Sequence, residues 1–236
     1  MPRMMPLLIL FSYLEDAVQA IVHLRMHANQ MAIIMNSWEI IGVIYMLLDI
    51  AIILTGTVLI ASSWNDGSGV VMLLLPRTLR SFAFGMWDYE LLLDYCVNVA
   101  CLLLLLAMRL SQRQADEWHN RQQQQRNLQR LLLLGRICMC CVFLLWIVEK
   151  HQIINKPFAV ACFIFMLFGV RCKLMASLTV LILLWHCCFQ ANGSLIFGWN
   201  DLTISMQFIS SLLSRVAGFF LLARLGGGKW SVDALV

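Results

Sequence analysis

The chain has 236 residues, of which 61% are hydrophobic and only 13% are charged, a composition too apolar for an ordinary soluble domain. Its net charge of +4 is small and scattered, so we expect no nucleic-acid partner. Each membrane crossing needs about 20 apolar residues. We therefore expect an all-α, polytopic membrane protein with about eight transmembrane helices.

Apolar runs separated by polar residues, glycine or proline predict eight helices. These helices cover residues 6–24, 39–61, 70–88, 90–108, 131–149, 157–171, 174–191 and 203–225. Glu15 and Asp16 interrupt the first run, which favours a retained helix over a cleaved signal peptide.

The polar segment 109–130 lies between the fourth and fifth predicted helices. It is expected to be either a solvated linker or a short helical hairpin. Segment 109–130 divides the predicted helices into two sets of four. The last helices of the two sets are weakly similar, as in proteins built from parallel repeats. Their sequences are YELLLDYCVNVACLLLLLA and LTISMQFISSLLSRVAGFFLLARLGGG. We predict a first four-helix membrane half at 1–108, a cytoplasmic linker at 109–130, a second four-helix half at 131–225 and a cytoplasmic tail at 226–236.

The distribution of basic residues predicts the orientation. With eight crossings and a cytoplasmic 109–130, ten basic residues lie on the cytoplasmic side and three on the other, which obeys the positive-inside rule. The ten are Arg3, Arg109, Arg113, Arg121, Arg126, Arg130, Arg171, Lys173, Arg224 and Lys229, and the three are Arg25, Lys150 and Lys156. The sequon Asn192-Gly193-Ser194 then lies on the lumenal side, which makes Asn192 a candidate glycosylation site.

Polar residues form a stripe on the first predicted helix. Ser12, Asp16, Gln19, His23 and His27 follow one another at spacings of four, three, four and four residues, which places them on one face. Glu15 lies at the edge of that stripe. Because an ionised group at the bilayer centre costs roughly 3 kcal/mol or more, the stripe faces protein or a wet cavity, unless this helix lies at the membrane interface.

The fourth and eighth predicted helices carry similar polar positions. Glu90, Asp94 and Asn98 are spaced i, i+4, i+8 on the fourth helix. The eighth helix carries Gln207, Ser211, Ser214 and Gly218, with Arg215 beside them. Cations available to the acids are Arg77, Arg80, Arg136 and Arg215. The groups form either structural ion pairs between helices or a polar pocket that receives a ligand.

No pattern predicts catalysis. The nine cysteines lie mostly inside apolar runs, where cysteine behaves as a small hydrophobe. The thiols of CMCC at 138–141 point around a helix, and His23 and His27 are not part of an H-E-x-x-H motif. The chain has no P-loop and no Rossmann glycine fingerprint. We expect no enzyme activity, no cofactor and no metal.

Several stretches together resemble the surfeit locus protein 4 family. They are YLEDAVQ at 13–19, LDIAIILTGTVLIAS at 48–62, WDYELLLDYCVNVACLLLLLAMRLS at 87–111, LLLLGRICMCCVFLLWI at 131–147, FGVRCKLMASLTVLILLW at 168–185 and ISMQFISSLLSRVAGFFLLARLGGGKWSVD at 204–233. The resemblance implies a multi-pass cargo receptor that cycles between the endoplasmic reticulum and the Golgi. Such receptors gather soluble secretory proteins in the lumen and couple them to COPII coat components.

The resemblance also implies a fold similar to a duplicated DoxX-type four-helix bundle. The sequence departs from the family pattern because it starts almost at its first helix and ends KWSVDALV without a dilysine signal. We therefore do not expect retrieval from the Golgi through that signal.

A cargo N-terminus carries an ammonium group, which a desolvated carboxylate binds through a charge-assisted hydrogen bond. The residues expected to bind cargo are Glu15, Asp16, Glu90, Asp94 and Asn98.

An alternative function is a membrane transporter or lipid-handling protein. In that case Arg77, Arg80, Arg136 and Arg215 would bind an anionic head group. A membrane oxidoreductase is a third alternative, but no cysteine pair has the spacing of a redox motif. Membrane lipids are expected partners, and the oligomeric state stays open.

Overall fold

A computed structural model describes residues 4–34, 36–83, 89–113, 121–148, 156–194 and 199–226, together with 228, 231 and 232. These described residues form helices and no strand, which confirms the all-α class. The helices are α1 (Met4–Val22), α2 (Leu24–Ile34), α3 (Glu39–Ala61), α4 (Asp66–Ala83), α5 (Tyr89–Arg113), α6 (Arg121–Met139), α7 (Cys141–Val148), α8 (Lys156–Phe168), α9 (Cys172–Ser194) and α10 (Trp199–Leu225).

Each predicted helical segment overlaps an observed helix, and α3 has the predicted bounds. Residues 84–88 and 149 of the predicted helices lie outside the described residues. The prediction did not include α2, because its polar residues suggested an exit from the membrane. Helix also extends into segment 109–130, where α5 continues to Arg113 and α6 begins at Arg121. Arginine, glutamine and leucine favour helix, so the polar ends of both helices need no apolar partner to form.

The predicted helix 131–149 is interrupted at Cys140, between α6 and α7. The Cys140 N–H donates to the carbonyls of both Arg136 and Ile137, at 3.1 Å each. The Phe143 N–H donates to the Cys140 carbonyl at 3.0 Å. One tightened turn therefore separates the two helices, and the apolar stretch stays nearly continuous.

By length and composition, four helical stretches of the described residues can cross a membrane. They are Met5–Val22, Glu39–Ala61, Leu92–Gln112 and Gln125–Ile147. Two shorter apolar helices cover Lys156–Phe168 and Cys172–Trp185. The number of eight crossings and the DoxX-like halves stay predictions.

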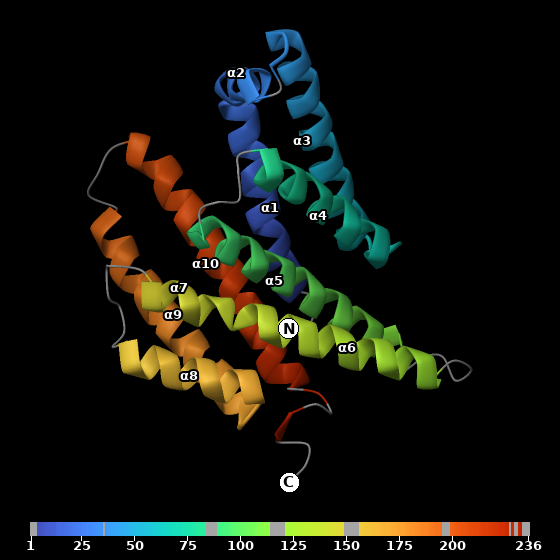
Figure 1. Cartoon of the computed structure of the whole chain (residues 1–236), viewed down its shortest axis with the longest axis vertical. Helices are drawn as coiled ribbons and strands as arrows, with labels where there is room; N and C mark the ends of the chain where they lie inside the picture. The colour runs from blue at the N-terminus through green and yellow to red at the C-terminus, as the bar shows by residue number, and fades with distance from the viewer. Residues whose placement is uncertain are drawn as a thin grey trace.

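The first and last helices of the chain lie side by side in the core. Figure 1 shows α2 and α3 at the top of the molecule, α8 and α9 at the lower left, and α1, α5 and α10 between them. α1 packs against α3 and α10, while α5 packs against α4, α6 and α10. One large hydrophobic cluster includes buried side chains from both predicted halves, such as Tyr13, Leu105 and Phe219.

Small residues allow close contacts between helices. A Cβ on Gly42 of α3 would lie 2.1 Å from the Ala28 carbonyl oxygen of α2. At the crossing of α3 and α4, a Cβ on Gly56 or on Gly69 would lie 3.2 Å from the other glycine's carbonyl oxygen. Such backbone approach is the usual way in which membrane helices gain packing contacts, because lipid provides no hydrophobic force between them.

Glycines also follow two helices in the second half of the chain. Gly169 follows α8 with φ of +70°, and the Val170 N–H donates to the Phe165 carbonyl at 2.9 Å, as in a Schellman motif. Gly226 follows α10 with φ of +79° and donates to the Leu222 carbonyl at 2.8 Å. Both positions use the left-handed conformation that glycine adopts without steric cost.

Candidate functional site

Two exposed tryptophans mark the ends of the apolar helix α3. Trp38 is 79% exposed and Trp64 is 83% exposed, as expected for side chains at the two membrane–water interfaces. The 23 residues of α3 span about 34 Å, enough to cross a hydrocarbon core of about 30 Å. α3 is therefore long enough to cross the membrane from one interface to the other.

An ion pair lies near the Trp64 end of α3. Arg109 Nε lies 3.8 Å from Asp66 Oδ1, and Arg109 Nη2 donates to the Ile60 carbonyl at 3.4 Å. Asp66 begins α4, where an acid is favoured by the helix dipole. Arg77 follows eleven residues later in α4, which is about 16 Å further along the helix axis. The Arg77 side chain thus lies about three turns from the Trp64 end of α4.

Arg77 is held by one turn of α1. Its Nε donates to Asp16 Oδ2 at 3.0 Å, its Nη2 donates to the same oxygen, and Nη2 also lies 3.4 Å from Ser12 Oγ. The guanidinium stands 4.3 Å from the ring centroid of Tyr13, which is buried. Hydrogen bonds from a charged donor to a charged acceptor and a cation–π contact together offset the cost of desolvating Arg77.

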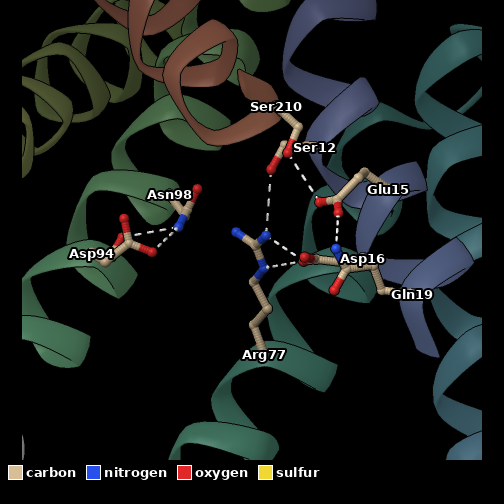
Figure 2. A network of polar contacts seen from close by, with 8 residues as sticks. All are labelled: Ser12, Glu15, Asp16, Gln19, Arg77, Asp94, Asn98 and Ser210. Carbon is tan, nitrogen blue, oxygen red and sulfur yellow. Dashed lines mark hydrogen bonds and ion pairs between the residues drawn. The ribbon is translucent and has the colours of Figure 1, made fainter. Parts of the chain in front are cut away.

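Glu15 has a different environment from that of its neighbour Asp16. It is buried between α1 and α10, where Ser210 Oγ donates to Oε2 at 3.0 Å and Gln19 Nε2 donates to Oε1. Both of these donors are neutral. Figure 2 shows Glu15 and Asp16 pointing to different partners from adjacent positions on α1.

A second ion pair joins α5 to α10. Arg215 Nη2 donates to Asp94 Oδ1 at 2.8 Å, and Asn98 Nδ2 donates to Asp94 Oδ2 at 3.1 Å. The Asp94 side chain is 42% exposed, more than that of Asp16 or Arg77. In Figure 2 the Arg77 guanidinium lies between Asp16 on one side and the Asp94–Asn98 pair on the other.

These residues form three neighbouring groups of polar contacts, which together join α1, α4, α5 and α10 and are called the polar network here. Its members are Ser12, Glu15, Asp16, Gln19, Arg77, Asp94, Asn98, Ser210 and Arg215. It holds the carboxyl groups of Glu15, Asp16 and Asp94 and the guanidinium groups of Arg77 and Arg215.

Two donors of the network have no hydrogen-bond acceptor within the described part of the chain. They are Arg77 Nη1 and Arg215 Nε, both buried. If all five charged groups are ionised, the described network carries one excess negative charge. The arrangement can therefore receive a cation together with a hydrogen-bond acceptor.

A comparison with protein-family models identifies the relatives of this chain. Residues 1–235 match the model described as the SURF4 family. The chain belongs to the SURF4 family. No curated protein and no solved structure matches it. Because the match spans nearly the whole chain and the helices are apolar, this SURF4 family member is a multi-pass membrane protein of the secretory system.

The structure brings together most of the residues that the sequence singled out in this SURF4 family member. Glu15, Asp16, Asp94 and Asn98 all belong to the network, as do Arg77 and Arg215. The buried Ser12 and Glu15 agree with a polar stripe that faces protein. The stripe ends earlier than predicted, since α1 stops at Val22 and His23 is exposed.

One other predicted residue lies apart from the polar network, and three have side chains that the structure does not describe. Arg136 is buried on α6, where a Cβ on Gly169 would approach its Nη1 to 2.3 Å, so it is separate from the network. The side chains of Glu90, Arg80 and Asn192 lie outside the described residues, although their backbones belong to α5, α4 and α9.

Sequence reasoning missed Ser210 and Tyr13. Ser210 lies four residues before the buried Ser214 on α10, so a search for a second stripe beside Ser211 could have found it. Tyr13 carries no sequence signal for a cation–π contact, because the contact depends on where α4 places Arg77.

The described residues show no group of three or more histidine, cysteine or acidic side chains that could hold a metal ion. The cysteines whose side chains are described form no disulfide.

Proposed function

We propose that this protein is a cargo receptor of the early secretory pathway, which recruits soluble lumenal proteins for transport from the endoplasmic reticulum to the Golgi in COPII vesicles. Membership of the SURF4 family supports a role in that pathway. Under this proposal the protein spans the membrane eight times. Segment 109–130 and the C-terminal tail face the cytoplasm and contact the coat.

The observation that carries the cargo-binding part of the proposal is the buried Glu15 carboxylate. Its described hydrogen bonds come from Ser210 and Gln19, which are neutral, whereas Asp16 and Asp94 each bond to an arginine. With all five groups ionised, Glu15 is thus the carboxylate that gives the network its excess negative charge. An ammonium group would balance that charge.

The donors of the network that have no described acceptor could bind the carbonyl groups that follow the ammonium group of a peptide. Arg77 Nη1 is buried without an acceptor among the described residues, and a peptide carbonyl could accept its hydrogen. The partial exposure of Asp94 leaves a polar side of the network open to a ligand. In this proposal Glu15 binds the cargo ammonium group, while Asp16 and Asp94 chiefly hold the arginines in place.

The Glu15→Gln variant is expected to lower secretion of a dependent cargo by about tenfold, because a charge-assisted hydrogen bond contributes roughly 1.5–3 kcal/mol. Glutamine keeps the shape of the side chain and can still accept from Ser210, so receptor abundance should not change. The measurement is pulse-chase secretion of that cargo from cells that express the variant in place of the parent chain.

Glu39→Gln is the matched control, because Glu39 is an exposed acid in the first turn of α3. It should secrete cargo at the parent rate. Secretion at the parent rate by Glu15→Gln, at equal receptor abundance, would remove Glu15 from cargo binding.

The arginines of the described residues do not form one common site, so they do not support the transporter or lipid-handling alternative. Arg77 and Arg215 are bonded to carboxylates, and Arg136 lies apart from them. An anionic head group at Arg77 or Arg215 would have to compete with Asp16 or Asp94.

A further inference from the structure

Exposed basic side chains gather outside the polar network, at the end of the chain's second predicted half. They come from α6, from the start of α9 and from the last turn of α10. We call them the basic collar: Arg126, Arg130, Lys173 and Arg224.

The residues that follow α10 connect these three segments. A Cβ on Gly226 would lie 3.3 Å from Lys173 Cε, and a Cβ on Gly228 would lie 3.0 Å from Gln129 Oε1. Both glycines have positive φ, +79° and +73°, so the chain turns after α10 and passes from α9 onto α6. This path places the collar residues of α9, α10 and α6 at one end of the molecule.

The collar lies where the apolar exterior of the helices begins. Arg130 on α6 is followed one turn later by the exposed Leu134. Lys173 is followed directly by the exposed Leu174, and the exposed Phe168 ends α8 five residues before it. Apolar side chains exposed on a membrane protein contact acyl chains, and a cation within one turn of them reaches the head groups. The collar therefore lies at head-group level.

Basic residues outnumber acids in the second half of the chain. Residues 121–236 contain eleven lysines and arginines but three acids, Glu149, Asp201 and Asp233. Asp201 is at the opposite end of α10 from Arg224. The cations thus produce a positive potential that attracts anions.

We propose that the basic collar is a binding surface for anionic phospholipid head groups of the leaflet that it faces. Its position at head-group level favours a lipid over an acidic protein segment, because a lipid contacts the collar and the adjacent apolar side chains together. Each cation near an anionic surface strengthens binding by roughly fivefold at low ionic strength. Binding by the collar would make the behaviour of the receptor depend on the lipid composition of its membrane, independently of cargo recognition.

The test uses the full chain purified in detergent and native mass spectrometry with dioleoyl phosphatidylserine or dioleoyl phosphatidylcholine as probe. The parent chain is expected to bind the serine lipid in preference to the choline lipid. The triple variant Arg130→Gln, Lys173→Gln, Arg224→Gln should reduce that preference by about tenfold or more. Arg25→Gln is the matched control, since Arg25 is an exposed cation on α2, near Glu39 and away from the collar, and it should keep the parent preference.

All three substituted side chains are exposed, so the melting temperature of the triple variant should equal that of the parent chain. If the triple variant does not fold, Lys173→Gln alone is expected to weaken serine-lipid binding by roughly fivefold. Parent-like preference in a folded variant would overturn the proposal. Loss of poly-glutamate binding with unchanged lipid binding would also overturn it, and would assign the collar to an acidic protein segment instead.

Discussion

Asp16→Asn is expected to lower the stability of the protein strongly, by roughly 3 kcal/mol in unfolding free energy, because it leaves the Arg77 charge without its carboxylate partner in a buried position. The Asp16 and Arg77 side chains are only 23% and 18% exposed, so water compensates little. A loss of this size should lower the melting temperature of the purified chain by about 10 °C.

The double variant Asp16→Asn, Arg77→Gln is expected to be more stable than either single variant. Replacing both charges removes the uncompensated ion, and a neutral amide pair can still form a hydrogen bond. A double-mutant cycle on melting, followed by tryptophan fluorescence, measures the coupling directly.

Glu39→Gln provides the control, because Glu39 belongs to an exposed pair with Arg25 at 3.7 Å. Exposed pairs contribute about 0–1 kcal/mol, so this change should hardly move the melting temperature. Strictly additive effects of the Asp16 and Arg77 substitutions would contradict the ion pair between them. Asp16 would then again be a candidate for binding a ligand.

Gly42→Ala is expected to loosen the contact between α2 and α3. The new methyl would lie 2.1 Å from the Ala28 carbonyl oxygen, and 3.2 Å from the Ala32 nitrogen. Since these are backbone atoms, the helices must separate, at a cost of roughly 1–3 kcal/mol. The melting temperature should then fall by about 5 °C or more.

Gly67→Ala is the matched control for this prediction. A Cβ there would meet only Asn65 Oδ1, at 3.8 Å, and alanine favours helix over glycine. Its melting temperature should equal or exceed that of the parent chain. Equal melting temperatures for Gly42→Ala and the parent would show that α2 does not pack against α3 in this way.

The two ion pairs show how one network can combine stability and binding. Asp16 and Asp94 fix the positions of Arg77 and Arg215, and through them the positions of four helices. Under the proposed function Glu15 keeps the charge that a cargo terminus needs. Substitutions of the paired acids should therefore reduce receptor abundance, whereas Glu15→Gln should reduce secretion without that loss.

The fold class and most helix positions could be predicted from the sequence, because long apolar runs have few stable alternatives to helix in a membrane. The prediction did not include α2, since its polar residues resemble a loop. Its helix is stabilised by Ala28 and Ala32 against Gly42, a contact between two segments that no local pattern reveals.

The sequence by itself determined which residues need a partner. A carboxylate or guanidinium group inside an apolar run is costly wherever the chain folds, so Glu15, Asp16, Arg77 and Asp94 could be singled out one by one.

Only the tertiary structure decided the partners. Asp16 lies 61 residues from Arg77, and Glu15 lies 195 residues from Ser210. These residues, far apart in the sequence, come into contact because α1 packs against α10 and because α4 and α10 both pack against α5. The distinction between a paired Asp16 and a Glu15 with neutral partners is therefore a property of helix packing.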